Sequence, residues 1–441
     1  MVLRISLIIL VLLFIDHWVL TISFMLGSIP ILATILYKPI ISPTFLSLIL
    51  ITDKLRVTLV MLTFWVCGLA LVSRTYILHA GYKARLYLRL VIRLWIILTL
   101  AFLVSSLLTF YILFEAALIP ILIIIILWGR RPERLYAGIY IIIYTISASL
   151  PLLFLLLLLK KDHGRLFYIR ECPSIGASTL FFISLAFLVK FPIYGVHIWL
   201  PKAHVEAPVG GSILLAGVLL KLGPYGIMRF IIIFPAYGEL IPLFTTWGIL
   251  GRLAAGIICI RQTDIKSLVA YASVSHIGLV LAALITYTNL GWWGARLILI
   301  GHGLARSGLF ALVGAVYEWT HSRSLIVNRG LIHIAPGLGL FFFLLVAFNI
   351  GVPPSLNIGA EVFIIRSLVV VEDPEAPIIY VILILFSVVS ILYRLALYTS
   401  LYHGEVSPSF NYFWTRPIYY TIRLLHIIPL VIGFFVIPVF L

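Results

Sequence analysis

Long apolar runs separated by short polar stretches dominate this sequence. A helix that spans a membrane needs about 20 mostly apolar residues at about 1.5 Å rise each, and most of the runs have that length. The pattern predicts about fourteen helical segments, at 2–15, 17–36, 54–74, 90–108, 109–128, 136–159, 174–199, 207–234, 239–260, 267–286, 291–314, 331–352 continuing to 371, 376–400 and 420–441. The first run follows Arg4 as in a secretory signal, but no small-residue cleavage site precedes the next run, so we expect a permanent first helix. The pattern thus predicts an all-α integral membrane protein.

Composition and charge indicate the same class. Of the 441 residues, 63% are hydrophobic and 10% are charged, whereas a soluble domain has about 45–50% apolar and about 25% charged residues. The chain therefore lacks the polar surface that water requires, and we expect the lipid bilayer to surround it. The net charge of +16 comes from basic residues that stand mostly between the apolar runs. Such a distribution is typical of membrane-protein loops, and no long basic tract indicates a nucleic-acid partner.

Motifs for metals and soluble cofactors are missing. The three cysteines, Cys67, Cys172 and Cys259, lie far apart without CxxC spacing, and an iron–sulfur cluster normally needs about four thiolates. His197 and His204 flank a Trp-Leu-Pro-Lys stretch, but no third or fourth ligand stands at a suitable spacing. No metalloprotease, dinucleotide or nucleotide-triphosphate motif occurs either. We therefore expect this chain to bind no metal and no cofactor.

Ionisable residues inside the apolar runs are the most informative positions. A charge at the bilayer centre costs at least about 2.5–3.5 kcal/mol, so each one needs a partner, a hydrated cavity or a function. These residues are Glu115, Lys190, Lys221 and Glu361. A structural interpretation stays open for each of them: a protonated, hydrogen-bonded carboxyl for Glu115, a side chain that reaches the interface for the lysines, and an interfacial carboxylate for Glu361.

Two proline-containing breaks stand next to these charges. Pro192 follows Lys190, and Pro353 and Pro354 precede Glu361. Proline lacks a backbone N–H and clashes with the carbonyl four residues earlier, so we expect both helices to be interrupted there. Broken helices in corresponding halves of a membrane protein indicate a transport site between repeats.

Histidines and arginines also stand in the apolar runs. His276 and His302 could pass protons near neutral pH or serve only as structural hydrogen-bond donors. The sequence indicates no role for five arginines that lie within or near helices. They are Arg252, Arg296, Arg306, Arg366 and Arg394.

Several long motifs carry a resemblance to a known family. Lys190 to Pro208 reads KFPIYGVHIWLPKAHVEAP, and Leu219 to Gly226 reads LLKLGPYG. Further matches are Phe114–Pro120, Pro132–Leu135, Arg261–Leu268, Tyr271–His276, Tyr317–Arg323 and Pro353–Asn357. Over residues 90 to 400 or so, the chain closely resembles the chain 4 family of mitochondrial NADH–ubiquinone oxidoreductase, respiratory complex I.

The resemblance implies a proton-translocating, antiporter-like membrane subunit of complex I in the mitochondrial inner membrane. It implies fourteen helices with two inverted five-helix repeats and discontinuous seventh and twelfth helices. The expected divisions are N-terminal transmembrane helices at 1–89, a first repeat at 90–234, a second repeat at 239–400 and a C-terminal transmembrane helix at 401–441. It also implies a non-redox subunit of an enzyme whose NADH, FMN, iron–sulfur clusters and ubiquinone lie in other parts of the complex. Its partners would be other membrane-arm subunits.

The family's relay residues match positions of this chain one by one. Its helix-five glutamate matches Glu115, its helix-seven lysine Lys190, its helix-eight lysine Lys221 and its helix-twelve glutamate Glu361. Its relay histidines match His276 and His302. Arg306 departs from the family pattern, which has a small uncharged residue there. Two alternatives stay open, a stand-alone sodium/proton antiporter subunit and a structural membrane scaffold.

Overall fold

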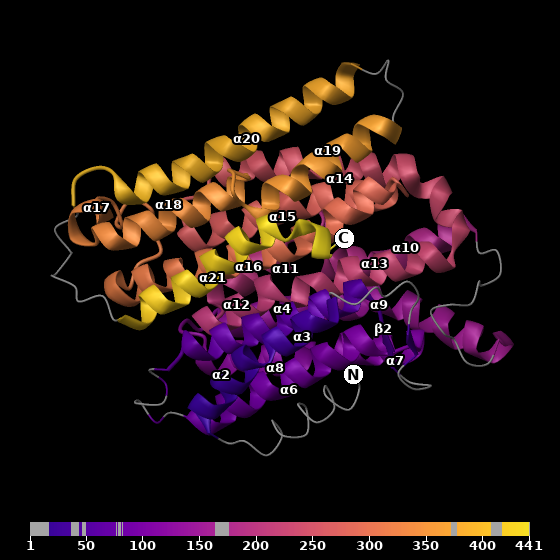
Figure 1. Cartoon of the computed structure of the whole chain (residues 1–441), viewed down its shortest axis with the longest axis horizontal. Coiled ribbons are helices and arrows are strands. Elements are labelled where there is room, and N and C mark those ends of the chain that lie inside the picture. Colours follow the sequence, from indigo (N-terminus) through magenta and orange to yellow (C-terminus); the bar gives the residue numbers. More distant parts are fainter. Residues whose placement is uncertain are drawn as a thin grey trace. The chain divides into compact units, whose positions relative to one another are not determined.

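The structure is a computed structural model that describes residues 17–36, 44–45, 50–75, 77, 81, 83–163, 176–371, 377–406 and 417–440. The predicted first segment, 2–15, and Cys172 lie outside these residues. The helices, labelled in part in Figure 1, are α2 (Trp18–Gly27), α3 (Ile29–Leu36), α4 (Lys54–Val72), α6 (Ala84–Leu103), α7 (Leu107–Ala116), α8 (Leu118–Trp128), α9 (Arg134–His163), α10 (Ala177–Lys190), α11 (Trp199–Glu206), α12 (Val209–Gly217), η1 (Leu219–Lys221, 3-10), α13 (Leu222–Ile233), η2 (Pro235–Leu240, 3-10), α14 (Ile241–Ile260), α15 (Ile265–Ile285), α16 (Asn289–Thr320), α17 (Leu331–Ile334), α18 (Pro336–Ile350), α19 (Leu356–Val371), α20 (Pro377–Tyr402), α21 (Pro417–Phe435) and α22 (Ile437–Phe440). Two short strands, β1 (Thr44–Phe45) and β2 (Ile51–Thr52), pair antiparallel with Thr44 opposite Thr52.

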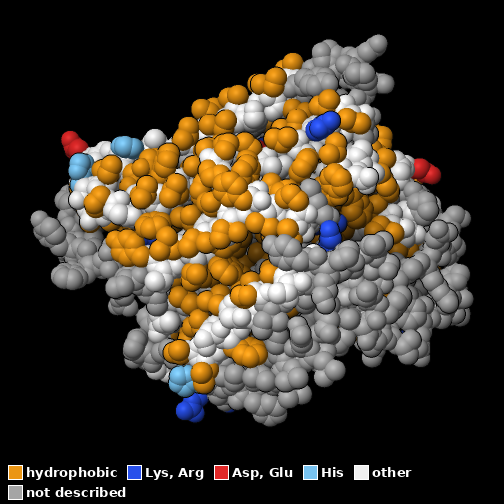
Figure 2. All heavy atoms as spheres, in the orientation of Figure 1, with side chains coloured by type: hydrophobic (Ala, Val, Ile, Leu, Met, Phe, Trp, Pro, Cys, Tyr) orange, Lys and Arg blue, Asp and Glu red, His pale blue; other side chains and the backbone are white. Residues whose placement is uncertain are grey.

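Many of these helices have the length and composition of membrane spans. Within the described ranges, nine helical segments are long and apolar enough to cross a membrane. On the face drawn in Figure 2, hydrophobic side chains cover most of the described surface and charged ones are few. The most apolar part of α16 is fully buried and that of α15 is 94% buried, whereas only 33% is buried in α9 and α20. Helices α15 and α16 therefore form a protein core, and α9 and α20 expose apolar side chains as lipid-facing helices do.

The chain folds into two compact units. The first unit comprises the described residues within Met1–Phe191, Glu206–Glu239 and Pro438–Leu441. The second unit comprises those within Pro192–Val205 and Leu240–Ile437. The segment Pro192–Val205, which contains most of α11, therefore packs with the second unit although it lies between two parts of the first along the chain.

Aromatic side chains pack the core of the first unit around α7, α10 and α13. The Phe187 ring lies 5.7 Å from the Phe114 ring and 4.9 Å from the Phe230 ring, measured between centroids. Tyr225 packs edge-on against Phe102, and its hydroxyl donates a hydrogen bond to the Phe102 carbonyl at 3.0 Å. Edge-to-face aromatic pairs add about 0.5–1.5 kcal/mol beyond the area that they bury. This packing holds the ends of α7 and α10, where two of the predicted site residues lie.

Small residues bring helices together in the second unit. A Cβ atom at Gly278 of α15 would lie 2.3 Å from the Gly248 carbonyl oxygen of α14, and one at Gly248 would lie 2.5 Å from the Gly278 oxygen. The two backbones therefore touch, and no side chain fits between them. Helix α16 packs against α15, α18, α19 and α21 and so occupies the centre of this unit.

Two predicted helix boundaries need correction. The predicted segment 90–108 begins earlier, at Ala84, as α6. Its first turns expose Arg85 and Arg89 and bury Tyr87, so a search for continuous apolar runs misses them. The predicted single helix 109–128 is two helices, α7 and α8, which meet at Ala117. Proline at 120 has no N–H to bond the carbonyl of residue 116, which explains the interruption.

The predicted helix 207–234 is also interrupted, between Gly217 and Leu222. Pro224 cannot donate to the carbonyl of Leu220, and it occupies the first turn of α13, where proline is tolerated. The bend therefore lies just before Gly223–Pro224, and it places Lys221 at a break between helices rather than within one.

Asp53 begins α4 and ties two parts of the first unit together. Its carboxylate accepts a hydrogen bond from the Arg56 backbone N–H at 2.8 Å, lies 3.6 Å from Arg56 Nε and forms an ion pair with Arg229 of α13. Burial raises the pKa of Asp53, but Arg229 and Arg56 outweigh this effect, so its pKa lies below the ordinary value. A carboxyl with a depressed pKa stabilises the fold at every pH above its ordinary pKa of about 3.9 and loses this contribution as the pH falls further.

We expect Asp53→Asn to destabilise the protein at neutral pH by about 3 kcal/mol, because Arg229 keeps its charge without the carboxylate. The measurement is the unfolding temperature of the detergent-solubilised protein. Glu239→Gln, at an exposed carboxylate, is the control and should change little. Equal unfolding temperatures for Asp53→Asn and the parent protein at neutral pH would contradict the assignment.

Candidate functional site

A lysine and a glutamate meet at a helix end in the first unit. Helix α10 ends at Lys190, because the residue before Pro192 is pushed out of helical backbone, and Phe191 has φ −99° and ψ 81°. The predicted break near Lys190 is thereby confirmed. Lys190 Nζ lies 3.5 Å from Oε1 of Glu115, which is in the last turn of α7. The same ammonium donates a hydrogen bond to the Phe114 carbonyl and lies 3.3 Å from the centre of the Phe114 ring.

The two partners differ in their access to the surroundings. The Lys190 side chain is 3% exposed and the Glu115 side chain 20% exposed. A buried ammonium is stable only with a counter-charge or hydrogen-bond acceptors, and Glu115, the Phe114 carbonyl and the Phe114 ring supply them. The protonation of Lys190 therefore depends on where the Glu115 carboxylate lies, and Glu115 is the member of the pair that the surroundings can reach.

Lys221 lies at a second break, near the first one. It is the last residue of η1, it is buried, and its ammonium donates a hydrogen bond to the Ala216 carbonyl, which the break leaves without a helical partner. A Cβ atom at Gly223 would lie 2.6 Å from Phe191 Cβ and 2.8 Å from the Phe187 carbonyl oxygen. The backbone after Lys221 therefore packs directly on the backbone after Lys190.

The two predicted histidines face each other in the second unit. His276 of α15 and His302 of α16 are buried, and their rings lie 5.6 Å apart between centroids. Nε2 of His276 has no hydrogen-bond partner among the described residues. Two imidazoles at this separation can exchange a proton after a small movement or through one water molecule.

Glu361 stands beside the third break. Helix α18 ends at Ile350 and α19 begins at Leu356, so the break predicted at Gly351–Pro354 is confirmed. Gly351 has a φ of +94°, and a Cβ atom there would lie 3.3 Å from Oε2 of Glu361. Asn357 Nδ2 donates to the Phe348 carbonyl at 2.8 Å and links the two helices across the break. Glycine at 351 thus allows both the turn and the position of the carboxylate.

Buried arginines surround Glu361 and the histidines, and the sequence assigned them no role. Arg252 of α14 and Arg394 of α20 interact electrostatically with Glu361. Arg306 of α16 donates to the Val269 carbonyl at 3.2 Å and to the Ala272 carbonyl at 2.8 Å, both on α15. Ala272 lies one turn before His276. The only sequence signal for these positions was that a charge within an apolar run needs a partner.

The six predicted residues thus form two groups. Glu115, Lys190 and Lys221 stand at helix ends of the first unit, and His276, His302 and Glu361 lie inside the second unit. Each group combines side chains that can bind and release protons, which is the chemistry a proton path requires.

Metal ligation has little support from the described residues. Among them, no three His, Cys, Asp or Glu side chains are grouped to hold a metal ion. The His197 ring stacks on Tyr194, and its Nδ1 accepts a hydrogen bond from the Gly195 N–H at 3.1 Å. The His204 ring stacks on Phe310 at 4.2 Å. Both histidines therefore act in packing, while Cys67 and Cys259 are buried free thiols.

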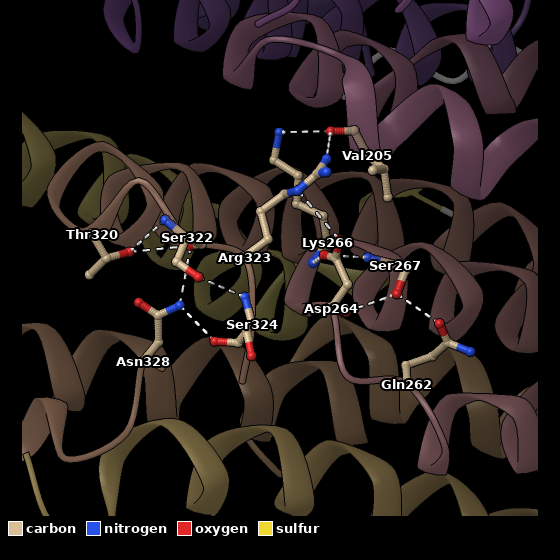
Figure 3. Close-up of polar contacts among 10 residues, drawn as sticks. All are labelled: Val205, Gln262, Asp264, Lys266, Ser267, Thr320, Ser322, Arg323, Ser324 and Asn328. Carbon is tan, nitrogen blue, oxygen red and sulfur yellow. Dashed lines mark hydrogen bonds and ion pairs between the residues drawn. The ribbon is translucent and has the colours of Figure 1, made fainter. Parts of the chain in front are cut away.

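Sequence reasoning missed a polar junction in the second unit, drawn in Figure 3. Arg323 and Lys266 both donate to the Val205 carbonyl near the end of α11, and Arg323 also pairs with Asp264. Asp264 precedes α15 and accepts hydrogen bonds from the backbone N–H groups of Lys266 and Ser267. Asp followed by a helix start was a readable N-cap signal, but its partner Arg323 lies 59 residues further along the chain, and Arg323 lies 118 residues after its acceptor Val205.

Comparisons with known proteins decide the family. Residues 104–394 match the family model for "NADH:quinone oxidoreductase/Mrp antiporter, TM", and residues 1–101 match that for "NADH-ubiquinone oxidoreductase chain 4, amino terminus". NADH-ubiquinone oxidoreductase chain 4 of Lumbricus terrestris is 37% identical over 396 residues, which cover 87% of this chain and 86% of that protein. This chain belongs to the NADH-ubiquinone oxidoreductase chain 4 family.

Solved structures share the chain 4 fold. A chain of respiratory complex I from Thermus thermophilus with bound NADH superposes with a TM-score of 0.84 at 24% identity, covering 98% of this chain and 94% of that one. A chain of the Mrp complex from Dietzia sp. superposes with a TM-score of 0.76 at 20% identity, covering 92% of this chain and 76% of that one. The predicted resemblance and the helical, antiporter-like membrane fold are confirmed.

Proposed function

We propose that this chain is a proton-translocating membrane-arm subunit of respiratory complex I in the mitochondrial inner membrane. The observation that carries the proposal is the buried Lys190–Glu115 pair at a helix break, in a member of the chain 4 family. NADH oxidation and ubiquinone reduction take place in other parts of the complex. This chain is a non-redox subunit of that enzyme, and its partners are other membrane-arm subunits and lipid.

The architecture that we propose has fourteen helices and two inverted five-helix repeats, at 90–234 and 239–400. The helices at 1–89 precede the repeats and a last helix at 401–441 follows them. The family's discontinuous seventh and twelfth helices correspond to the breaks after Lys190 in the first repeat and after Ile350 in the second. The breaks after Lys190 and after Ile350, together with the division into two compact units near residue 239, support this arrangement.

The relay works by moving a counter-charge. While the Glu115 carboxylate lies next to Lys190, the buried ammonium is stable. When the carboxylate moves away, the ammonium loses its counter-charge in a poorly solvated site and releases its proton. The proton then passes by way of Lys221, His276 and His302 to Glu361. Glu361 receives the proton beside Arg252 and Arg394, which interact electrostatically with its carboxyl group.

The driving force comes from outside this chain. Each of the six relay residues binds or releases a proton, and none of them oxidises or reduces a substrate. Energy from the redox reaction must therefore shift a charge near Glu115 or change the hydration of the breaks. Helix breaks at membrane depth suit this purpose, because their free carbonyls can take up water.

A stand-alone sodium/proton antiporter is the alternative that the likeness to the Mrp complex raises. A chain 4 relative matches this chain over 87% of its length, the chain 4 amino-terminal family model matches residues 1–101, and both favour complex I. Sodium-dependent proton flux in the absence of NADH would favour the antiporter instead.

A native gel of mildly solubilised membranes tests the proposed function. The gel is stained for NADH dehydrogenase activity and probed with an antibody to this chain. We expect the chain to co-migrate with the active band of high mass. Migration of the chain in a separate band without NADH dehydrogenase activity would overturn the proposal.

A further inference from the structure

The segment Pro192–Val205, here called the strap, begins at the helix break beside Lys190 and is connected to the break at Lys221 through α12. It follows α10, which ends at Lys190, and it leads into α12, which ends just before Lys221. The strap itself packs with the second unit. The strap is therefore covalently linked to the backbone at Lys190 directly and to the backbone at Lys221 through one helix.

The beginning of the strap is anchored on α14. The Trp247 Nε1–H donates to the Tyr194 carbonyl at 2.8 Å. A Cβ atom at Gly251 would lie 2.8 Å from Tyr194 Cβ, so the strap lies directly on the α14 backbone. Gly195 follows with a φ of +101°, a turn that residues with a side chain rarely adopt.

The end of the strap is held by two cations. The last carbonyls of a helix have no partner within it, and they carry its partial negative charge. The Val205 carbonyl near the end of α11 accepts a hydrogen bond from Arg323 Nη1 at 2.8 Å and another from Lys266 Nζ at 3.4 Å (Figure 3). Both side chains are largely buried, at 9% and 6% exposure, so water competes little with these bonds.

The same two residues belong to the helices that carry the relay histidines. Lys266 lies in the first turn of α15, which contains His276. Arg323 lies just after α16, which contains His302, and its Nε is 3.4 Å from Oδ2 of Asp264, the N-cap of α15. Backbone bonds complete the junction: the Ile265 N–H donates to the Arg323 carbonyl and the Leu325 N–H donates to the Thr263 carbonyl, both at 2.9 Å.

Hydrogen bonds within the loop that contains Arg323 fix its conformation. Asn328 Nδ2 donates to the Ser322 carbonyl at 3.2 Å and to the Ser324 carbonyl at 2.8 Å, and the hydroxyl of Thr320 donates to the Ser322 carbonyl (Figure 3). These bonds close the loop on both sides of Arg323. The junction is thus a fixed point at which α11, α15 and α16 meet.

We propose that Arg323 and Lys266 are positioning residues for proton transfer, which hold the end of the strap in register with the histidine-bearing helices α15 and α16. Through the strap they set the backbone position at Lys190, and through the strap and α12 that at Lys221. Loosening the junction lets the lysine-bearing breaks and the histidines shift independently, so proton transfer becomes incomplete and the ubiquinone-linked oxidation coupled to it slows. The inference rests on the proposed function.

The test uses the whole complex in its native membrane with Arg323→Met, Lys266→Met and Arg323→Lys. Arg329→Met is the matched control, because Arg329 is an exposed arginine of the same loop. Four quantities are measured: assembled complex on a native gel, NADH oxidation by an artificial electron acceptor, ubiquinone-linked NADH oxidation with the protons moved per NADH, and the pH profile of that coupled rate. Oxidation by the acceptor needs no proton transfer, so it reports on intact redox subunits.

For both methionine variants we expect unchanged assembly and acceptor oxidation, fewer protons per NADH and a shifted pH profile. The coupled rate should fall by about tenfold, since a displacement near 1 Å can cost up to ~10²-fold. Arg323→Lys should recover part of the coupling, because a lysine already donates to the Val205 carbonyl, and Arg329→Met should behave as the parent.

Unchanged coupling in both methionine variants would overturn the proposal. The proposal would also be overturned if the coupled rate fell only in proportion to the amount of assembled complex and its pH profile did not change. That result would show a purely structural role for the two residues. If the parent complex lacked this chain or moved no protons, the proposed function itself would be overturned. The two failures are therefore distinguishable.

Discussion

Replacing Lys190 by methionine is expected to abolish proton pumping through this chain while the complex still assembles. Methionine has nearly the length of lysine and suits a side chain that is 3% exposed and packed on the Phe114 ring. Glu115 is the more exposed member of the pair, so its side chain keeps contact with its surroundings when the ammonium is removed. Assembly therefore survives, and only the proton-binding group is lost.

The size of this effect follows from the position of Lys190 in the relay. A path without one of its proton carriers has a higher barrier, and each ~1.4 kcal/mol slows the coupled rate about tenfold. We expect at least one such step. The measurement is the number of protons translocated per NADH in sealed vesicles, together with the rate of ubiquinone reduction and the amount of complex on a native gel.

Lys160→Met is the control for this experiment, because Lys160 is an exposed lysine near the end of α9. It should leave proton translocation at the parental value. Normal translocation in Lys190→Met itself would remove Lys190 from the relay and favour the interpretation of the chain as a structural scaffold.

Replacing Gly278 by alanine is expected to prevent accumulation of the folded chain. The added Cβ atom would lie 2.3 Å from the Gly248 carbonyl oxygen and 3.2 Å from the Arg252 backbone nitrogen. Because both neighbours are backbone atoms, no side chain can turn away, and α14 and α15 must separate. Their separation removes the close packing between the two helices. Overpacking of this kind lowers the free energy of unfolding by about 1–3 kcal/mol or more. His276, two residues earlier, would shift with the helix.

The assembled complex on a native gel and the unfolding temperature measure this effect. Gly27→Ala is the matched control, since it is the same substitution in helix α2 and its Cβ atom meets nothing within 4 Å. Both substitutions gain the same ~1 kcal/mol of helix propensity, so only the steric clash differs. Equal amounts of complex from the two variants would show that α14 and α15 do not need their backbone contact.

Local patterns in the sequence determined the class of this protein and much of its layout. Apolar runs of spanning length predict helices whatever their neighbours are, because a backbone in lipid must satisfy its own hydrogen bonds. Proline acts within four residues, so the breaks beside Lys190 and before Glu361 were predictable. A buried charge is costly in any fold, and this cost singled out Glu115, Lys190, Lys221 and Glu361 before their partners were known.

The tertiary structure alone decided which of these groups meet. Glu115 and Lys190 are 75 residues apart, and no sequence spacing places a carboxylate against that ammonium; the packing of α7 and α10 does. Packing also brings Arg252 and Arg394 near Glu361 and places the Val205 carbonyl of the strap against Arg323 and Lys266. Periodicity and proline chemistry act between residues a few positions apart. Pairing depends on which helix surfaces fit together, and that fit exists only in the folded chain.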